Sequence, residues 1–301
     1  MSVLHTCSGV KPPRHSSLSS SESVNIPLGI SFPTTKIILL HNGKTASTTH
    51  NLISTRFLTR RVKMAESLPL VISPSGSSSV DPAYCEIIVV RHGETGWNVD
   101  GRLQGHLDVE LNDVGREQAV AVADRLAKEF KISVVYSSDL NRALETARTI
   151  AKTCGGLEVI EDQDLRERHL GDLQGLVFSE AAKICPDAHK ALASQRTDME
   201  IPGGGESLDQ LYKRCTTALQ RIGRKHKGQR VAVVTHGGVI RALYKRACPN
   251  DKSGGKVLNT SVNIFQLSDA KKWILKTWGD VSHLSQTGVL LTGFGGNRTS
   301  G

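Results

Sequence analysis

From residue 84 onward the chain alternates between short apolar runs and longer segments with helical spacing. The apolar runs occupy residues 87–90, 132–136, 157–160 and 231–234. The helical segments, with an apolar residue every three or four positions, occupy residues 115–130, 141–154, 207–225 and 239–247. Continuous β-branched runs of this kind are typical of strands buried on both faces. The alternation predicts an α/β three-layer sandwich, in which a mostly parallel sheet has helices on both faces.

Two later segments complete the predicted sheet. Residues 262–267 and 273–278 alternate between apolar and polar side chains, so we expect them to pair as antiparallel strands. The start of one helix is also marked, because Ser207 and Gln210 have the spacing of a capping box.

Residues 1–63 differ in composition from the rest of the chain. They contain 19 serine and threonine residues and eight lysine or arginine residues, but only one acid, Glu22. This composition is typical of an organelle transit peptide, so we expect import into plastids (chloroplasts) or, as a second choice, mitochondria. A disordered tail without a targeting role is one alternative, and initiation at Met64 would give a shorter, cytoplasmic protein. We predict a linker at residues 64–83 and the folded domain at residues 84–301.

The net charge of +9 is concentrated in that first segment. The 238 residues after it carry 30 basic and 28 acidic groups, so the charge says little about what the folded domain binds. Aromatic residues make up only 4% of the chain, which argues against a stacking platform for nucleic acid. No apolar run approaches the length of about eighteen residues that a membrane span needs. The six cysteines lack metal-binding spacing, and we expect reduced thiols in an intracellular compartment.

Two of the predicted strands are followed directly by a histidine and a glycine. Arg91 and His92 follow the first apolar run, and His236 follows the fourth. The carboxyl ends of parallel strands meet at one edge of a sheet, where α/β proteins bind ligands. We expect Arg142, which comes after the second strand, at the same edge. Two histidines and two arginines together predict a site for one anionic group, because arginine recognises phosphate through paired hydrogen bonds.

The arginines also bear on the chemistry of the histidines. Neighbouring positive charge favours the neutral form of an imidazole, and a neutral imidazole is a nucleophile. Either motif by itself is equally consistent with a structural turn: an ion pair after one strand, or a helix start after the other. Their combination with Arg142 at one predicted edge favours a reactive site.

Six motifs, in order along the chain, resemble those of the histidine phosphatase superfamily in its phosphoglycerate mutase-like branch. They are RHGETGWN (91–98), RLQGHLDVELNDVGREQA (102–119), YSSDLNRALETA (136–147), LRERHLGDLQG (165–175), GGGES (203–207) and VTHGGVIRAL (234–243). The resemblance extends from residue 85 to about residue 267 and is strongest to plant phosphoglycerate mutase-like members and bacterial broad-specificity phosphatases. It implies a phosphoglycerate mutase-like fold and a reaction that passes through a phosphohistidine.

The resemblance also implies a role for each matching residue. His92 would be the nucleophile, and Glu167 would be the proton donor. Arg91, Arg142 and His236 would hold the phosphoryl oxygens. Further contacts to phosphate or substrate would come from Thr95, Asn98, Gln104, Gly105 and Gly237. No metal and no cofactor is implied, because the side chains supply the positive charge. Considered without the family, Glu167 in its Arg-Glu-Arg-His context is typical of an exposed surface ion pair.

The family contains both phosphatases and mutases, and three features favour hydrolysis. Dedicated mutases carry a long basic insertion after the proton-donor motif, whereas residues 176–202 contain no Arg-Arg pair. Leu170 stands where the mutases have tyrosine, and His236 is followed by two glycines rather than Gly-Asn. We therefore expect a metal-independent phosphomonoesterase, with a cofactor-dependent phosphoglycerate mutase as the alternative.

A third hypothesis is an inactive binding or scaffold protein. Such a protein would be expected to lack His92, Arg142 or His236, and all three are present. The expected partner is a small phosphorylated metabolite, with phosphoserine as one candidate, and neither nucleic acid nor a membrane. We expect residues 176–202 to contribute contacts to the substrate. The sequence leaves the physiological substrate and the oligomeric state open.

Overall fold

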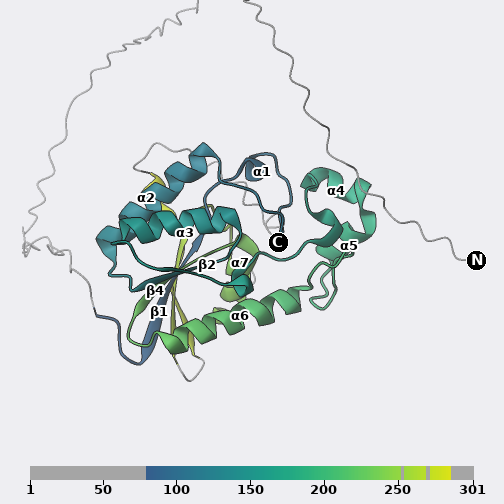
Figure 1. The fold of residues 1–301 in the computed structure, drawn as a ribbon. Coiled ribbons are helices and arrows are strands. Elements are labelled where there is room, and N and C mark those ends of the chain that lie inside the picture. The colour runs from purple at the N-terminus through teal and green to yellow at the C-terminus, as the bar shows by residue number, and fades with distance from the viewer. Residues whose placement is uncertain (1–78, 252–253, 269–271, 286–301) are drawn as a thin grey trace, which may run out of the picture. The chain divides into compact units, whose positions relative to one another are not determined.

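The computed structural model describes residues 79–251, 254–268 and 272–285, drawn as the coloured ribbon in Figure 1. The predicted transit segment at residues 1–63 lies outside the described residues, as do residues 64–78 of the predicted linker. The first strand begins at Tyr84, where the sequence places the start of the folded domain.

Six strands form one sheet in the order β3-β2-β4-β1-β5-β6. Their bounds are β1 Tyr84–Arg91, β2 Val134–Ser137, β3 Val159–Glu161, β4 Arg230–Thr235, β5 Val262–Ser268 and β6 Trp273–Asp280. β4 pairs in parallel with both β1 and β2, and β2 pairs in parallel with β3. β5 and β6 extend the sheet beyond β1 as antiparallel strands. The predicted mostly parallel sheet and the predicted antiparallel pair are both confirmed.

Helices cover both faces of this sheet. Their bounds are α1 Gly96–Val99, α2 Asp113–Glu129, α3 Asn141–Thr153, α4 Phe178–Ile184, α5 Pro186–Ala193, α6 Leu208–Lys225 and α7 Gly237–Ala247. Short 3₁₀ turns form at η1 Gln163–Leu165, η2 Gly171–Leu173 and η3 Ser282–Leu284. α2 and α3 pack on one face, and α6 and α7 pack on the other (Figure 1). The predicted three-layer sandwich is confirmed, and α6 begins with the predicted capping box of Ser207 and Gln210.

The central strand β1 shows why the layers form. Successive side chains of a strand point to opposite faces. Ile88 and Val90 pack with α2 and α3, whereas Ile87 and Val89 pack with α6 and α7. All four are fully buried, and each such burial stabilises the fold by about 1.5–3 kcal/mol. Because both faces are covered, every position needs an apolar side chain, which explains the continuous run in the sequence.

The order of the central strands brings three chain segments to one edge of the sheet. β1 and β4 are parallel neighbours in which Arg91 lies beside Thr235, so the residues that follow both strands emerge together. β5 runs antiparallel to β1, with Val262 opposite Val90. The residues that precede β5 therefore reach the same edge.

Residues 176–202 form a small helical region that the sequence pattern did not predict. Their helices α4 and α5 have seven and eight residues and pack in a separate apolar cluster together with Leu173 and Ile201. Several of the inward side chains are alanines, including Ala181 and Ala188. Helices this short, with such small inward residues, produce an apolar periodicity too weak to recognise.

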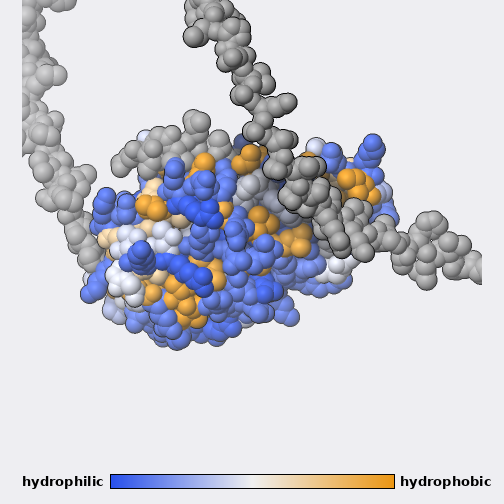
Figure 2. Space-filling view, turned by 45° about the horizontal axis from the view of Figure 1, so that its top comes forward, coloured by the Kyte–Doolittle hydropathy of each residue, from blue (hydrophilic) through white to orange (hydrophobic). Residues whose placement is uncertain are grey.

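One face of the molecule is mainly polar. Figure 2 shows hydrophilic residues over most of one face, with hydrophobic residues in small separate groups. In the part of the chain that the structure describes, no helix has the length and apolar character needed to cross a membrane. Within the described ranges, Cys85, Cys154, Cys215 and Cys248 are free thiols.

Candidate active site

A narrow cavity of about 10 Å³ lies at the carboxyl end of β1. It is lined by Arg91, His92, Asn98, Gln104, Gly105, Arg142, Glu167 and Leu170. All except Leu170 were predicted as site residues. His236 follows β4, and its ring centre lies 5.2 Å from that of His92. The structure thus brings the five predicted catalytic side chains to one place.

His92 is buried, and a backbone carbonyl fixes its ring. Its Nδ1 lies 2.7 Å from the carbonyl oxygen of Gly93, which can only accept a hydrogen bond. Nδ1 therefore carries a proton, and in the neutral ring the lone pair lies on Nε2. Burial, followed by the charges of Arg142 and Arg91, lowers the pKa of His92 well below its usual value. At neutral pH the imidazole is uncharged and has a free lone pair, as a nucleophile requires.

Two buried arginines stand beside this imidazole. Arg91 donates from Nη1 to the carbonyl of Val257 (2.6 Å). Arg142 donates from Nη1 to the carbonyl of Leu107 (3.0 Å) and from Nη2 to that of Gly105 (2.8 Å). Burial lowers the pKa of each guanidinium to about 10, so both remain charged at neutral pH. The carbonyls orient these charges without neutralising them.

Four buried polar atoms at the site have no hydrogen-bond partner among the described residues. They are Arg91 Nε, Arg142 Nε, His236 Nδ1 and Asn259 Oδ1. Buried polar groups in folded proteins are almost always paired, so a cluster of unpaired ones indicates a ligand. Three of the four are nitrogens of arginine or histidine, which suits an anion. The arrangement fits a phosphoryl group beside His92.

Glu167 is buried, with only 4% of its surface exposed, so its interpretation as an exposed ion pair is wrong. Its Oε1 accepts from the N–H of Arg168 (2.8 Å) and its Oε2 from the N–H of Gly238 (3.0 Å). Burial raises the pKa of Glu167, although the two N–H groups and nearby arginines oppose the shift. A raised pKa keeps the carboxyl closer to its protonated form, as a proton donor requires. The charged neighbours of Glu167 in the sequence suggested an exposed side chain, but tertiary packing decides whether a side chain is buried.

The residues predicted to contact substrate fall into two groups. Asn98, Gln104 and Gly105 line the cavity. Thr95 does not, but it forms a capping box with Asn98 at the start of α1 and donates from Oγ1 to Oε1 of Gln104 (3.2 Å). Thr95 therefore orients two of the lining side chains. Gly237, the first residue of α7, also lies outside the lining.

Gly105 shows why glycine is needed in this wall. Its φ is +54°, and a Cβ added there would lie 2.2 Å from Oε1 of Gln174. Any other residue would combine a left-handed backbone with a steric clash. The carbonyl that orients Arg142 therefore depends on glycine at this position.

Two residues of the site, Asn259 and Ser138, were not predicted from the sequence. Asn259 donates from Nδ2 to the carbonyl of His92 (3.0 Å), and Ser138 Oγ lies 2.8 Å from Nε2 of His236. Asn259 reaches the site because β5 begins at the edge where β1 ends. Its only sequence signal was a polar Asn-Thr-Ser segment directly before a predicted antiparallel strand.

Residues 87–281 match the histidine phosphatase superfamily (branch 1). The chain belongs to this superfamily. Phosphoglycerate mutase-like protein 4 of Arabidopsis thaliana is 68% identical to it over 223 residues, which cover 74% of this chain and 97% of the relative. The metal-independent phosphoserine phosphatase of the same plant is 56% identical over 218 residues, which cover 72% of this chain and 91% of the relative.

A solved structure shares the fold of this histidine phosphatase. It is a phosphoserine phosphatase from Entamoeba histolytica in complex with 3-phosphoglyceric acid, which matches with a TM-score of 0.58 and 27% identity over 66% of this chain and 99% of that one. The predicted family, fold and phosphatase activity are confirmed. The roles of individual residues stay predictions. Within the described ranges, no three His, Cys, Asp or Glu side chains gather as metal ligands would.

The lowered pKa of His92 predicts that stability depends on pH. Burial lowers the pKa of His236 as well. Both histidines take up a proton near pH 6.5 when the chain unfolds, whereas in the folded chain they stay neutral to lower pH. The unfolded chain thus binds more protons below pH 6.5, so stability falls by about 1 kcal/mol for each histidine between about pH 7.5 and pH 5.5.

Urea unfolding at the two pH values measures this loss. The His92→Asn variant should lose roughly 1 kcal/mol less over the interval than the unsubstituted protein, because one histidine that stays neutral in the folded chain has been removed. An equal loss in both proteins would contradict a neutral, buried His92.

Proposed function

We propose that this protein hydrolyses small anionic phosphomonoesters, with phosphoserine as the first candidate, through a phosphohistidine formed on His92. The observation that carries the proposal is the set of unpartnered buried nitrogens next to a neutral His92. The 56% identical relative named as a phosphoserine phosphatase supports the choice of substrate.

In the first step, the lone pair of His92 Nε2 attacks phosphorus in line, and the bond to the leaving oxygen breaks. Arg91 and Arg142 donate to the phosphoryl oxygens, which carry the spreading negative charge, and His236 donates through Nδ1. Glu167 transfers its proton to the leaving oxygen, so that an alcohol departs. The hydrogen bond from His92 Nδ1 to the carbonyl of Gly93 stabilises the phosphorylated ring.

In the second step, a water molecule attacks the phosphohistidine. Glu167, now a carboxylate, takes a proton from the water, and the N–P bond breaks with its electron pair returning to His92 Nε2. Inorganic phosphate is the product. Because the two arginines supply the positive charge and His236 donates as a neutral imidazole, we propose that no metal ion takes part.

A larger cavity of about 320 Å³ beside Glu167 supports an anionic leaving group. Gly238, whose N–H binds Glu167, contributes to its wall. The lining includes the cationic side chains of Arg168, Arg241 and Lys245 and no carboxylate, together with apolar residues. A carboxylate on the leaving group would meet opposite charge there. Serine, the alcohol released from phosphoserine, carries such a carboxylate.

Phosphoglycerate mutase is the second candidate, favoured by the name of the 68% identical relative. A mutase has to retain the phosphoenzyme and hold a second phosphate. Leu170, at the sequence position where the mutases have tyrosine, lines the narrow cavity. Residues 176–202 contain no Arg-Arg pair. These features favour release of phosphate, so we propose hydrolysis as the main reaction.

Labelling tests the covalent step. Brief incubation with radiolabelled phosphoserine should give a phosphoprotein that is labile to acid and stable to alkali, with phosphate released at the same time. His92→Ala should give no labelled protein, because the nucleophile is absent, and a chelator should leave turnover unchanged. An acid-stable adduct would refute the phosphohistidine. Rapid conversion of 3- to 2-phosphoglycerate without phosphate release would favour the mutase.

A comparison of leaving groups tests Glu167. A serine alkoxide leaves badly and needs a proton, whereas a nitrophenolate leaves well without one. Glu167→Gln should therefore lose on the order of 10²–10⁴-fold in kcat/KM for phosphoserine, and much less for p-nitrophenyl phosphate. His92→Ala should lose both activities. Equal losses on both substrates in Glu167→Gln would assign Glu167 to binding or structure.

We also propose import into plastids, supported by the hydroxyl-rich and acid-poor composition of residues 1–63. A fusion of that segment to a fluorescent protein should accumulate in plastids in leaf cells. A diffuse cytosolic signal would contradict the proposal and favour initiation at Met64 or a tail without a targeting role.

A further inference from the structure

Glu167 lies on a segment without regular secondary structure. Residues 166–170 connect η1 to η2, so neither a helix nor a strand fixes the backbone that carries this carboxylate. The hydrogen bonds of the carboxylate itself come from backbone N–H groups, one of them in the same segment. Its position in the site therefore depends on contacts that hold this backbone.

Arg214, on α6, provides such contacts. Its Nη1 donates to the carbonyls of Asp164 (2.8 Å) and Arg166 (2.9 Å), and its Nη2 donates to the carbonyl of Glu167 (3.1 Å). A single planar guanidinium thus binds three carbonyls at and before the proposed acid. The rigid fork of arginine makes this spacing possible, whereas the single nitrogen of lysine cannot reproduce it.

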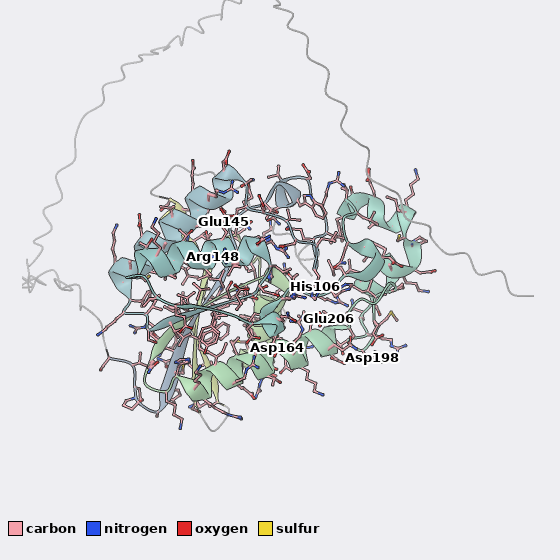
Figure 3. All side chains as sticks on the ribbon, in the orientation of Figure 1. His106, Glu145, Arg148, Asp164, Asp198 and Glu206 are labelled. Atoms are coloured by element: carbon pink, nitrogen blue, oxygen red, sulfur yellow. The ribbon has the colours of Figure 1, made fainter. Side chains whose placement is uncertain are left out.

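Glu206 holds Arg214 in turn. Its two carboxylate oxygens each accept at 2.8 Å, one from Nε and one from Nη2 of Arg214, and the second also accepts from the N–H of His169 at 2.9 Å. The two side chains are only 18% and 20% exposed. Figure 3 shows Glu206 and Asp164 near α6, the helix that carries Arg214.

His106 adds a further contact to the same backbone. Its Nε2 lies 2.7 Å from the carbonyl oxygen of Glu167 and donates to it. The carbonyl of the proposed acid therefore accepts from two side chains, which come from different parts of the chain. Both donors act on the backbone of Glu167 and leave its carboxyl group free to face the site.

We infer that Arg214, held by Glu206, is a positioning residue for the proton donor. The inference rests on the proposed role of Glu167. Arg214 does not line the narrow cavity, so it reaches the reaction only through the backbone that it binds. A displacement of about 1 Å in a catalytic group can cost roughly 100-fold in rate. Loosening this support should therefore impair protonation of the leaving group more than attack by His92.

Arg214→Lys tests the inference, because it keeps the charge and removes the fork. It should lose at least about ten-fold more kcat/KM on phosphoserine than on p-nitrophenyl phosphate, the same direction of selectivity as Glu167→Gln. In a double variant with Glu167→Gln, the added loss on phosphoserine should be less than about three-fold, since the group being positioned is gone. Glu206→Gln, which removes the carboxylate but preserves shape, should show the same selectivity even if Arg214→Lys folds poorly.

Arg221→Lys is the matched control. Arg221 lies two turns further along α6 and pairs with the side chains of Asp162 and Asp164, but not with the backbone of Glu167. This variant should keep the unsubstituted ratio of the two activities. Equal losses on both substrates in Arg214→Lys and Glu206→Gln, or a fully additive double variant, would overturn the inference. If Glu167→Gln itself shows no selectivity, the proposed acid is wrong and the inference falls with it.

Discussion

The burial of two positively charged guanidinium groups beside a neutral imidazole is the constraint around which this molecule is organised. Arg91 and Arg142 are each 1% exposed, and removing such a charge from water costs several kcal/mol unless it finds partners. Backbone carbonyls supply part of the compensation, while the Nε atoms stay unpaired. The site is therefore incomplete without an anion, and its chemistry follows from that imbalance.

The same environment favours the protonation states that the two proposed catalytic groups, the nucleophile and the proton donor, require. Burial favours the uncharged form of any ionisable side chain. It lowers the pKa of His92 and raises that of Glu167, so both move towards neutrality. A neutral imidazole with a free Nε2 and a protonated carboxyl are the forms that a nucleophile and a proton donor need. One physical cause thus produces both halves of the proposed reaction.

Different parts of the fold position His92 and Glu167. The proposed nucleophile, His92, follows β1, which is buried on both faces and paired on both sides, so its position comes from the sheet. The proposed acid stands on irregular backbone, so its position comes from side chains on other elements, above all Arg214 of α6. The two groups are thus held in place by different kinds of contact within one fold.

The sequence by itself determined the sheet, most of the long helices and the cationic edge. Those features rest on local patterns: apolar runs for doubly covered strands, three-to-four spacing for helices, and a His-Gly pair directly after two strands. Tertiary structure alone decided the burial of Glu167, the approach of Asn259 to His92 and the contact of Arg214 with the acid-bearing segment. The helices within residues 176–202 were also not predicted, because their alanine-rich inward faces give little apolar periodicity. The contacts of Glu167, Asn259 and Arg214 join residues far apart in the chain, and only packing brings these residues together.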